Sequence, residues 1–289
     1  MGCLLVRCIK WYYSLSKRIR DSIVISITLT GAISTIFSIL GISLGDYTEL
    51  SIWIRIVLVL IILIGVGFLA YFVLGKLFRD SITLSINQTP ISISYGDIFN
   101  KSDWIVIGCD THFDTRVDDV VISKKSLHGQ LVLQHGKKEE IEEIRNKEGK
   151  RLNLHKGEDG LYDFLLGTII RYDSSVDHHT YLMLAMTKLD SQYEAHTNMA
   201  DFEHMLMRMW TEIDRVYASN NIAFPLLGAG ISRFDDGPKS QENLLKCMLC
   251  TLNSSSVSLN SAINIVIYDN SKDIPLYEYK DLFHDISRR

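Results

Sequence analysis

Two long apolar runs near the start of the chain set the first 80 residues apart from the rest. They lie in uncharged stretches of 24 and 20 residues, bounded by Asp21 and Asp46 and by Arg55 and Lys76. About 20 apolar helical residues cross the ~30 Å hydrocarbon core of a bilayer. The first run is too long for a cleavable signal peptide, so we expect a transmembrane helical hairpin over residues 21–80. Its two apolar segments are Ile23–Leu44 and Ile52–Leu74.

Basic residues flank this expected hairpin on both sides. Five precede it within residues 1–20, and Lys76 and Arg79 follow it, whereas the short connection carries only the acidic Asp46 and Glu49. The positive-inside rule then places both ends of the chain in the cytoplasm. Residues 1–20 are expected to form a basic amphipathic segment at the inner leaflet.

Hydroxyl side chains recur every four residues in the first apolar segment, at Ser26, Thr30, Ser34 and Ser38. Such spacing gathers them in one stripe on a helix. Small and hydroxylated residues in lipid mark contacts between helices. One interpretation is that the stripe packs against the second helix of the same chain. The other is that it meets further subunits or lines water.

From residue 81 the pattern changes to short β-rich runs that alternate with helices. The order strand–helix–strand–helix–strand over residues 181–268 predicts a largely parallel sheet with helices on both faces. The expected strands are Ser81–Ile86, Ile91–Tyr95, Trp104–Gly108, Phe164–Arg171, Tyr181–Leu189, Ile222–Leu227 and Ala262–Tyr268. The expected helices are Met199–Ser219 and Ser240–Leu252, with a charged, solvated helix or insertion at Lys137–Gly157.

Charge narrows the function of this second part. Residues 1–80 carry 8 basic and 4 acidic side chains (+4), so the remainder carries 22 and 30 (−8). A field of that sign does not attract a phosphate backbone, and nucleic-acid binding is disfavoured. The five cysteines form no disulfide framework, and the single Cys247-Met248-Leu249-Cys250 lacks the second pair of a zinc site. We expect no bound metal.

The segment Phe224–Ser232 is the strongest candidate for ligand binding. It is a buried strand that runs into a loop of small residues, Gly228-Ala229-Gly230, before a helix. Ligands of open α/β sheets bind at the carboxyl ends of strands, where glycines let backbone N–H groups approach a phosphate. An ordinary strand-to-helix turn explains the same residues. The spacing is neither a dinucleotide fingerprint nor a Walker loop.

Two further polar segments follow predicted strands. Tyr95-Gly96-Asp97-Ile98 presents a carboxylate suited to the amine of adenine, although an Asx-turn at a strand end has the same pattern. The polar run from Cys109 to Arg116 comes directly after the strand that begins at Trp104. We expect all three segments at one edge of the sheet.

The ordered combination of Gly96-Asp97-Ile98, the polar loop and Pro225-Leu226-Leu227-Gly228-Ala229-Gly230-Ile231 resembles the macro domain, an ADP-ribose-binding module. The resemblance covers about residues 81–289 and implies an α/β/α three-layer sandwich. It implies adenine contacts at Asp97 and Ile98, a diphosphate cradle in the glycine loop, and a distal ribose near Asp110 to Thr115. The full set of implied ligand-binding residues is Asp97, Ile98, Asp110, Thr111, His112, Phe113, Asp114, Thr115, Leu227, Gly228, Ala229, Gly230, Ile231, Ser232, Arg233, Tyr268 and Asp269.

The sequence departs from the hydrolytic members of that family. Those carry an asparagine-rich loop followed by a run of glycines, where this chain has Gly-Cys-Asp-Thr-His-Phe-Asp-Thr from Gly108 onward. We therefore expect a binding module without catalytic residues or a resident cofactor. The alternative is a membrane-tethered ADP-ribosyl hydrolase.

A two-helix hairpin followed by a divergent macro domain resembles the ThsA effectors, of the membrane–macro type, in bacterial Thoeris anti-phage defence. The segments Val117–Ser123 and Ser126–Gly129 belong to that resemblance. It implies a multi-pass protein of the bacterial inner membrane and a partner TIR-domain enzyme that makes an ADP-ribose signal from NAD. The implied signal is histidine-conjugated ADP-ribose. Its binding would drive formation of a homo-oligomer that disrupts the lipid bilayer.

Overall fold

The computed structural model describes residues 15, 17–39, 51–77, 81–157, 159–190, 192–230, 233–268 and 276. The chain divides into two compact units between residues 80 and 81. The helical unit holds α2 (Lys17–Ile39) and α3 (Ile52–Leu77), and the α/β unit holds the strands and the other helices. Each unit is described by itself.

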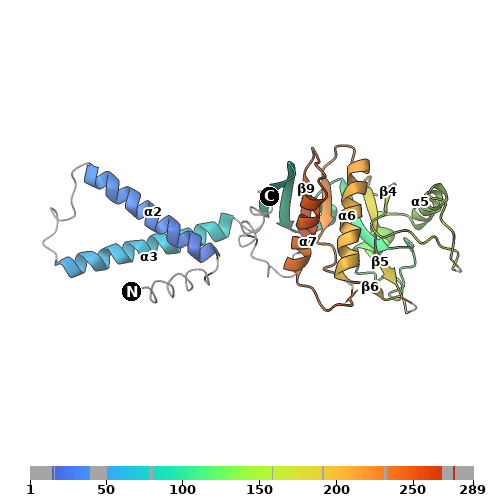
Figure 1. Ribbon diagram of the computed structural model, residues 1–289, viewed down its shortest axis with the longest axis horizontal. Helices are drawn as coiled ribbons and strands as arrows, with labels where there is room; N and C mark the ends of the chain where they lie inside the picture. Colours follow the sequence, from blue (N-terminus) through green and yellow to red (C-terminus); the bar gives the residue numbers. More distant parts are fainter. Residues whose placement is uncertain are drawn as a thin grey trace. The chain divides into compact units, whose positions relative to one another are not determined.

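In the helical unit α2 and α3 cross and pack against each other (Figure 1). Ser26 is buried, and its Oγ donates a hydrogen bond to the backbone oxygen of Leu63 at 2.6 Å. Gly67 lies opposite Ser26 and leaves room for this close approach. Both helices otherwise present apolar side chains outward, and Ile64 and Phe68 on α3 are 71% and 70% exposed.

The hydroxyl stripe is divided between two surfaces. Ser26 faces α3 and Thr30 is half-buried, as expected if the stripe packs within the chain. Ser34 and Ser38 are exposed, so the contact with α3 does not use them. The intramolecular interpretation therefore holds for the first half of the stripe only.

One helix in the described part of the chain is long and apolar enough to cross a membrane. Its 18-residue window runs from Ile19 to Ile36 within α2. The apolar stretch of α3, Val59–Gly75, is shorter than the 18 residues of that window. The expected hairpin thus has one candidate span by length and composition, and residues 40–50 that would close it lie outside the described residues.

The α/β unit is built on one mixed sheet with strand order β1-β2-β9-β7-β3-β5-β6-β8. The remaining strand, β4, pairs with residues 180–184 of β5, ahead of the residues that pair with β6. The five strands β2, β9, β7, β3 and β5 are mutually parallel. β1 runs antiparallel to β2, β4 and β6 run antiparallel to β5, and β8 runs parallel to β6. The strands are β1 Ser81–Ile86, β2 Thr89–Tyr95, β3 Trp104–Asp110, β4 Ile169–Asp173, β5 Thr180–Leu189, β6 Ala195–Thr197, β7 Ile222–Pro225, β8 Arg233–Phe234 and β9 Ile263–Ile267.

Helices cover both faces of the sheet, which confirms the three-layer sandwich. On one face α6 and α7 lie side by side, and Trp210 of α6 packs on Phe224 of β7 with ring centroids 5.2 Å apart (Figure 1). On the other face Ile141 of α5 joins a core that includes Ile105 and Tyr181. The helical segments are η1 Ile98–Asn100, α4 Leu127–Gln130, the π-turn η2 Leu131–His135, α5 Lys138–Arg151, α6 Met199–Val216 and α7 Gln241–Ser254.

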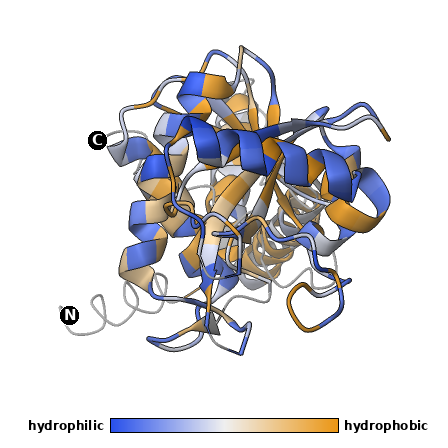
Figure 2. Cartoon of the chain, turned by 90° about the vertical axis from the view of Figure 1, so that its right-hand side faces the viewer, coloured by the Kyte–Doolittle hydropathy of each residue, from blue (hydrophilic) through white to orange (hydrophobic). Residues whose placement is uncertain are grey.

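Local chemistry explains where these elements begin and end. Asn87 and Gln88 both have positive φ and form the two-residue turn of the β1–β2 hairpin. Asn198 and Ser240 cap the N-termini of α6 and α7 by accepting backbone N–H groups. In Figure 2 the strands inside the unit are orange and the outer helices carry blue, the amphipathic arrangement that packing on one face requires.

The structure corrects several expected bounds. The strand expected at Phe164–Arg171 begins only at Ile169, because the left-handed turn at Gly167 (φ +83°) precedes it. The helix expected to reach Ser219 ends at Val216, since Ala218 and Ser219 both have positive φ. The sequence did not predict β6 and β8, because strands of three and two residues are too short to show an alternation of apolar and polar positions. The charged stretch from Lys137 forms α5, and one side of α5 is buried through Ile141, Arg145 and Gly149.

We predict that Gly149→Ala in α5 destabilises the α/β unit by about 1–3 kcal/mol. Alanine normally stabilises a helix relative to glycine, but a Cβ here meets the Tyr162 ring at 2.3–2.7 Å. Equilibrium urea unfolding followed by tryptophan fluorescence measures the change. Glu143→Ala on the exposed side of α5 is the control and should change stability by less than about 0.5 kcal/mol. A more stable Gly149→Ala protein would contradict the packing described here.

Candidate ligand site at the switch point of the sheet

The central strands β3 and β7 meet at a topological switch point. After β3 the chain continues through α4, α5 and β4 to β5 on one side of the pair. After β7 it goes first to β8, which pairs with β6 beyond β5, and α7 then leads to β9 on the other side. The two strands pair only at Trp104↔Ile222 and Ile105↔Ala223, and the chain from β7 to β8 connects strands on opposite sides of β3. Crevices for ligands in open α/β sheets form at this position.

The β7 loop (residues 226–232) lies on one side of the switch point. The N–H of Leu226 donates to the oxygen of Val266 at 3.1 Å, and that of Ala229 turns back to Leu226. Gly228 needs its positive φ of +78° for this turn, whereas Gly230 is exposed and a Cβ on it would meet no atom within 4 Å. An incoming group can therefore approach the backbone at Gly230. Ile231 and Ser232 lie outside the described residues, and of Arg233 the structure describes the backbone, in β8.

The end of β2 lies at the same edge, beyond β9. The N–H of Gly96 donates to the oxygen of Ile267 at 3.0 Å, so Asp97 comes near the end of β9 and near Tyr268. The Asp97 carboxylate is exposed, but its two oxygens accept from Phe99 N and Asn100 Nδ2 at 3.1 and 2.9 Å. It therefore forms the Asx-turn considered as the alternative. Tyr268 is 68% exposed, and Asp269 lies outside the described residues.

The β3 loop (residues 110–116) lies on the other side of the switch point and is held by its own carboxylates. Asp110 is buried, and its Oδ1 accepts from the backbone N–H of His112 at 2.7 Å. Asp114 accepts from the backbone of Thr115 and binds the Arg116 guanidinium through Nε at 2.8 Å. Burial opposes ionisation of Asp114, but the hydrogen bonds from Arg116 prevail and lower its pKa.

Three residues of α4 and α5 contact the β3 loop. Arg145 of α5 is buried and donates to the backbone oxygen of Phe113 at 3.3 Å, and Glu142 accepts from Thr115 Oγ1 at 2.6 Å. His128 of α4 is 5% exposed, with its Nδ1 3.8 Å from Asp110 Oδ2. The sequence singled out His128 only as part of the resemblance, and it gave Arg145 and Glu142 no signal beyond charge at helical spacing, which is typical of a solvated face.

Three of the expected ligand residues have side chains that point into the core. Phe113 is fully buried and packs edge-to-face on Phe164 at 5.1 Å, and Ile98 and Leu227 are 4% and 2% exposed. The contacts that these three residues can offer to a ligand are therefore those of their backbone groups. Thr111 is also buried, whereas His112 is half-buried, with Nε2 3.9 Å from Asp163 Oδ1.

A cavity of about 310 Å³ lies near the β3 loop, and its lining residue Asp163 is 3.9 Å from His112. Polar side chains from Asp163, Lys188, His204 and Arg208 line it together with apolar residues of the 164–166 turn and Met205. It contains none of the residues expected to bind a ligand. Its proximity follows from the hydrogen bond between the N–H of Phe164 and the oxygen of Thr111 at 2.9 Å.

The α/β unit also matches a known family of domains. The family model of the Thoeris protein ThsA macro domain matches residues 91–268, more than half of the chain. The chain belongs to the ThsA macro-domain family. A relative in the same family, the Thoeris protein ThsA of Bacillus amyloliquefaciens (strain Y2), is 29% identical over 271 residues. The alignment covers 91% of this chain and 88% of that relative, so it includes residues ahead of the macro domain.

Solved macrodomain structures overlap with the chain more distantly. Two mutants of the Oceanobacillus iheyensis macrodomain, one of them with ADPR, are 15% identical with TM-scores of 0.49 and 0.47. The overlaps cover 72% and 71% of this chain and 99% and 98% of the macrodomain chains. Thermosipho africanus DarTG in complex with ADP-ribose gives 15% identity and a TM-score of 0.41, with 64% and 43% covered.

We predict that His128 makes this ThsA-family domain less stable in mild acid. Burial lowers the pKa of His128, against the attraction of Asp110 and Asp114, so its protonation favours the unfolded chain. Stability is then lost as the pH falls through the unfolded value of about 6.5, with a limiting slope of about 1.4 kcal/mol per pH unit. Unfolding curves of wild type and His128→Gln between pH 7.5 and 5 measure the difference.

The variant should show the shallower loss of stability towards pH 5. Neighbouring carboxylates raise the pKa of His196, so its contribution to the pH dependence of stability has the opposite sign. That contribution is the same in wild type and variant and cancels in the comparison. Identical slopes for the two proteins would show that His128 is not held neutral.

Proposed function

We propose that the macro unit is a sensor for an ADP-ribose derivative and that binding controls assembly of the helical unit. The observation that carries this proposal is the switch point, where the β7 loop and the β3 loop flank one position at the carboxyl edge of the sheet. Membership of the ThsA macro-domain family supports it. The Thoeris name of the relative supports a role in anti-phage defence.

The diphosphate is assigned to the β7 loop. Residues 81–289 have a net charge of −8, so their overall field repels phosphate. The attraction must therefore come from local backbone dipoles. Gly230 offers a backbone open to close approach. Gly228, Ala229, Ile231, Ser232 and Arg233 complete the proposed cradle.

The two sugar–base ends are assigned to the flanking segments. Asp97 and Tyr268 are exposed at the edge formed by β2 and β9, where adenine would lie. The distal ribose would lie at the β3 loop, near His112 and the backbone of residues 110–115. The histidine-conjugated form of ADP-ribose is the proposed signal, and a TIR-domain enzyme that consumes NAD is its proposed source.

The helical unit is the proposed effector. Its outward apolar side chains form a surface far larger than soluble monomers expose, and lipid is the environment that such a surface requires. We propose that α2 and α3 both span the bacterial inner membrane with both termini in the cytoplasm. A single pair of helices encloses no conducting path, so disruption of the bilayer needs several copies brought together.

Calorimetric titration of the full chain in detergent tests the sensor. ADP-ribose and its histidine conjugate are titrated separately, and release of ADP-ribose from a modified protein is assayed in parallel. Binding without turnover supports a sensor, and turnover would support the alternative of a membrane-tethered ADP-ribosyl hydrolase. Absence of binding to both compounds would refute the proposal.

We predict that Gly230→Glu abolishes this binding, a loss of at least about 100-fold, while the fold is kept. The backbone at Gly230 has no positive φ, and open space surrounds it, so the side chain is accommodated but occupies the approach and repels phosphate. Gly230→Ala is the matched control, with a methyl group and no charge, and should lose far less affinity. Titration measures both variants, and wild-type affinity in Gly230→Glu would show that the β7 loop does not hold the ligand.

We predict that Ser34→Leu combined with Ser38→Leu abolishes depolarisation and toxicity in cells that make the signal. Both hydroxyls are exposed on α2, away from α3, and such contacts contribute about 0.5–2 kcal/mol each in lipid. Insertion and ligand affinity should be unchanged. Thr28→Leu with Thr35→Leu, two exposed hydroxyls on another side of α2, is the control. Full toxicity in the Ser34/Ser38 variant would place assembly on a different surface.

A further inference from the structure

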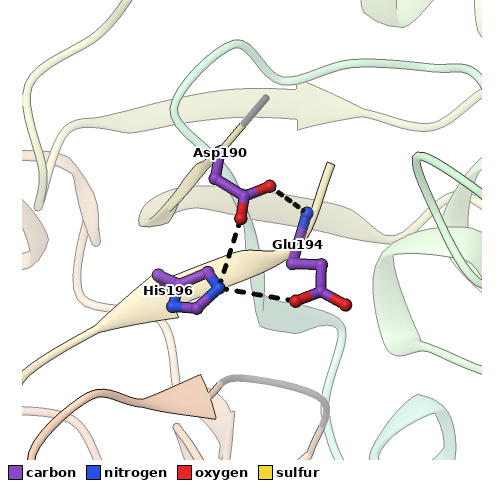
Figure 3. Close-up of side chains that lie close together, drawn as sticks. All are labelled: Asp190, Glu194 and His196. Carbon is purple, nitrogen blue, oxygen red and sulfur yellow. Dashed lines mark hydrogen bonds and ion pairs between the residues drawn. The ribbon is translucent and has the colours of Figure 1, made fainter. Parts of the chain in front are cut away.

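A cluster of one histidine and three carboxylates lies where the β5–β6 hairpin meets β8. Asp190 and Glu194 come from the tip of the hairpin and His196 from β6 (Figure 3). Asp235 follows β8, which pairs with β6 through His196↔Arg233. This carboxylate–histidine cluster shares no residue with the proposed nucleotide site, and nothing in its sequence spacing drew attention to it.

The two ring nitrogens of His196 have different surroundings. Nδ1 lies 2.6 Å from Asp235 Oδ1, a short hydrogen bond. Nε2 lies 3.4 Å from Asp190 Oδ2 and 3.6 Å from Glu194 Oε2, beyond the 2.7–3.2 Å of an N–H···O hydrogen bond. Nε2 is nevertheless buried as an atom and has no hydrogen-bond partner among the described residues.

These separations match the spacing of ligands around a small cation. Bonds of 2.0–2.2 Å in a tetrahedral zinc site put neighbouring donor atoms about 3.3–3.6 Å apart. The donor atoms of Asp190, Glu194 and His196 all lie within 4.8 Å of one another. The two separations from His196 Nε2, 3.4 and 3.6 Å, are thus longer than direct hydrogen bonds and equal to those between two ligands of one zinc ion.

The donors are also held in place by the backbone. Asp190 Oδ1 accepts from Gln192 N at 2.7 Å and Glu194 N at 2.9 Å, which directs Oδ2 towards His196. Asp235 is fixed by its own N–H, which donates to Thr197 O at 2.9 Å. A histidine that binds metal through one nitrogen typically donates the other N–H to a carboxylate, as Nδ1 does here to Asp235.

We propose that Asp190, Glu194 and His196 form a Zn²⁺ site, with Asp235 as the positioning residue of the imidazole. One nitrogen and two carboxylate oxygens suit Zn²⁺ better than Mg²⁺, which prefers oxygen ligands alone. Water completes the tetrahedron. The ion joins the tip of the β5–β6 hairpin to β6, whose ladder with β8 fixes the chain directly after the β7 loop. This proposal departs from the expectation of no bound metal.

A proton is the competing occupant. The carboxylates, Asp235 first, raise the pKa of His196, and an imidazolium would also neutralise part of the cluster. Zinc and this proton exclude each other, because metal binding needs the lone pair of Nε2. Zinc affinity should therefore fall in mild acid.

The full chain in detergent is first stripped of metal with a chelator. Zn²⁺ is then titrated in the presence of a fluorescent zinc indicator, which competes with the protein for the ion. We expect one equivalent to bind, and Mg²⁺ in 100-fold excess not to displace it. His196→Ala should lose at least about 100-fold in affinity and Asp235→Asn about 10–100-fold, the usual range for a residue that orients a ligand. His204→Ala, an exposed histidine of α6, is the matched control and should bind as wild type does.

Zinc-edge X-ray absorption identifies the donors. Nitrogen and oxygen neighbours without sulfur are expected, and sulfur neighbours would show capture by the cysteines and overturn the proposal. Wild-type affinity in His196→Ala, or no stoichiometric binding, would also overturn it and leave the proton as occupant. Circular dichroism checks the fold, and Glu194→Gln at the hairpin tip carries the same test if His196→Ala does not fold. None of these results depends on the nucleotide.

Discussion

The short pairing of β3 with β7 is the constraint on which the rest of the α/β unit depends. These strands pair over only two residues each, and they are parallel neighbours at the centre of the sheet. Their carboxyl ends therefore bring the β7 loop and the β3 loop to one edge although more than 100 residues separate them in sequence. The same strand order accompanies α5 on one face and α7 on the other, so a single topological choice produces both the layers and the site.

Buried polar groups determine the shape of the β3 loop. Asp110 and Asp114 use their carboxylates to hold the loop's own backbone and Arg116, and Arg145 reaches the backbone of Phe113 from α5. Buried charges are costly unless they are paired, so these contacts fix one loop conformation. A ligand at this edge would therefore meet a preformed surface with few free carboxylates. Such a surface favours recognition over proton transfer.

The helical unit follows a different physical rule. Ser26 and Gly67 let α2 and α3 approach closely, and the remaining apolar side chains point outward. In water such exposure is unfavourable, whereas in lipid it is the stable arrangement. An α/β unit with an internal core and a helical unit with an external apolar surface thus occupy one chain, and their packing follows opposite patterns.

The sequence by itself determined the regular features: the apolar runs, the strand–helix alternation, and the glycine loop after Phe224, because periodicity and turn residues are local properties. Family resemblance added the macro fold, which the match to residues 91–268 confirms. Only the tertiary structure decided which hydroxyls of the stripe face α3, that Phe113 and Ile98 point inward, and that Asp97 closes an Asx-turn. The clusters around His128 and His196 were likewise beyond the sequence, because their members come from separate elements, and only the packed sheet brings them within bonding distance.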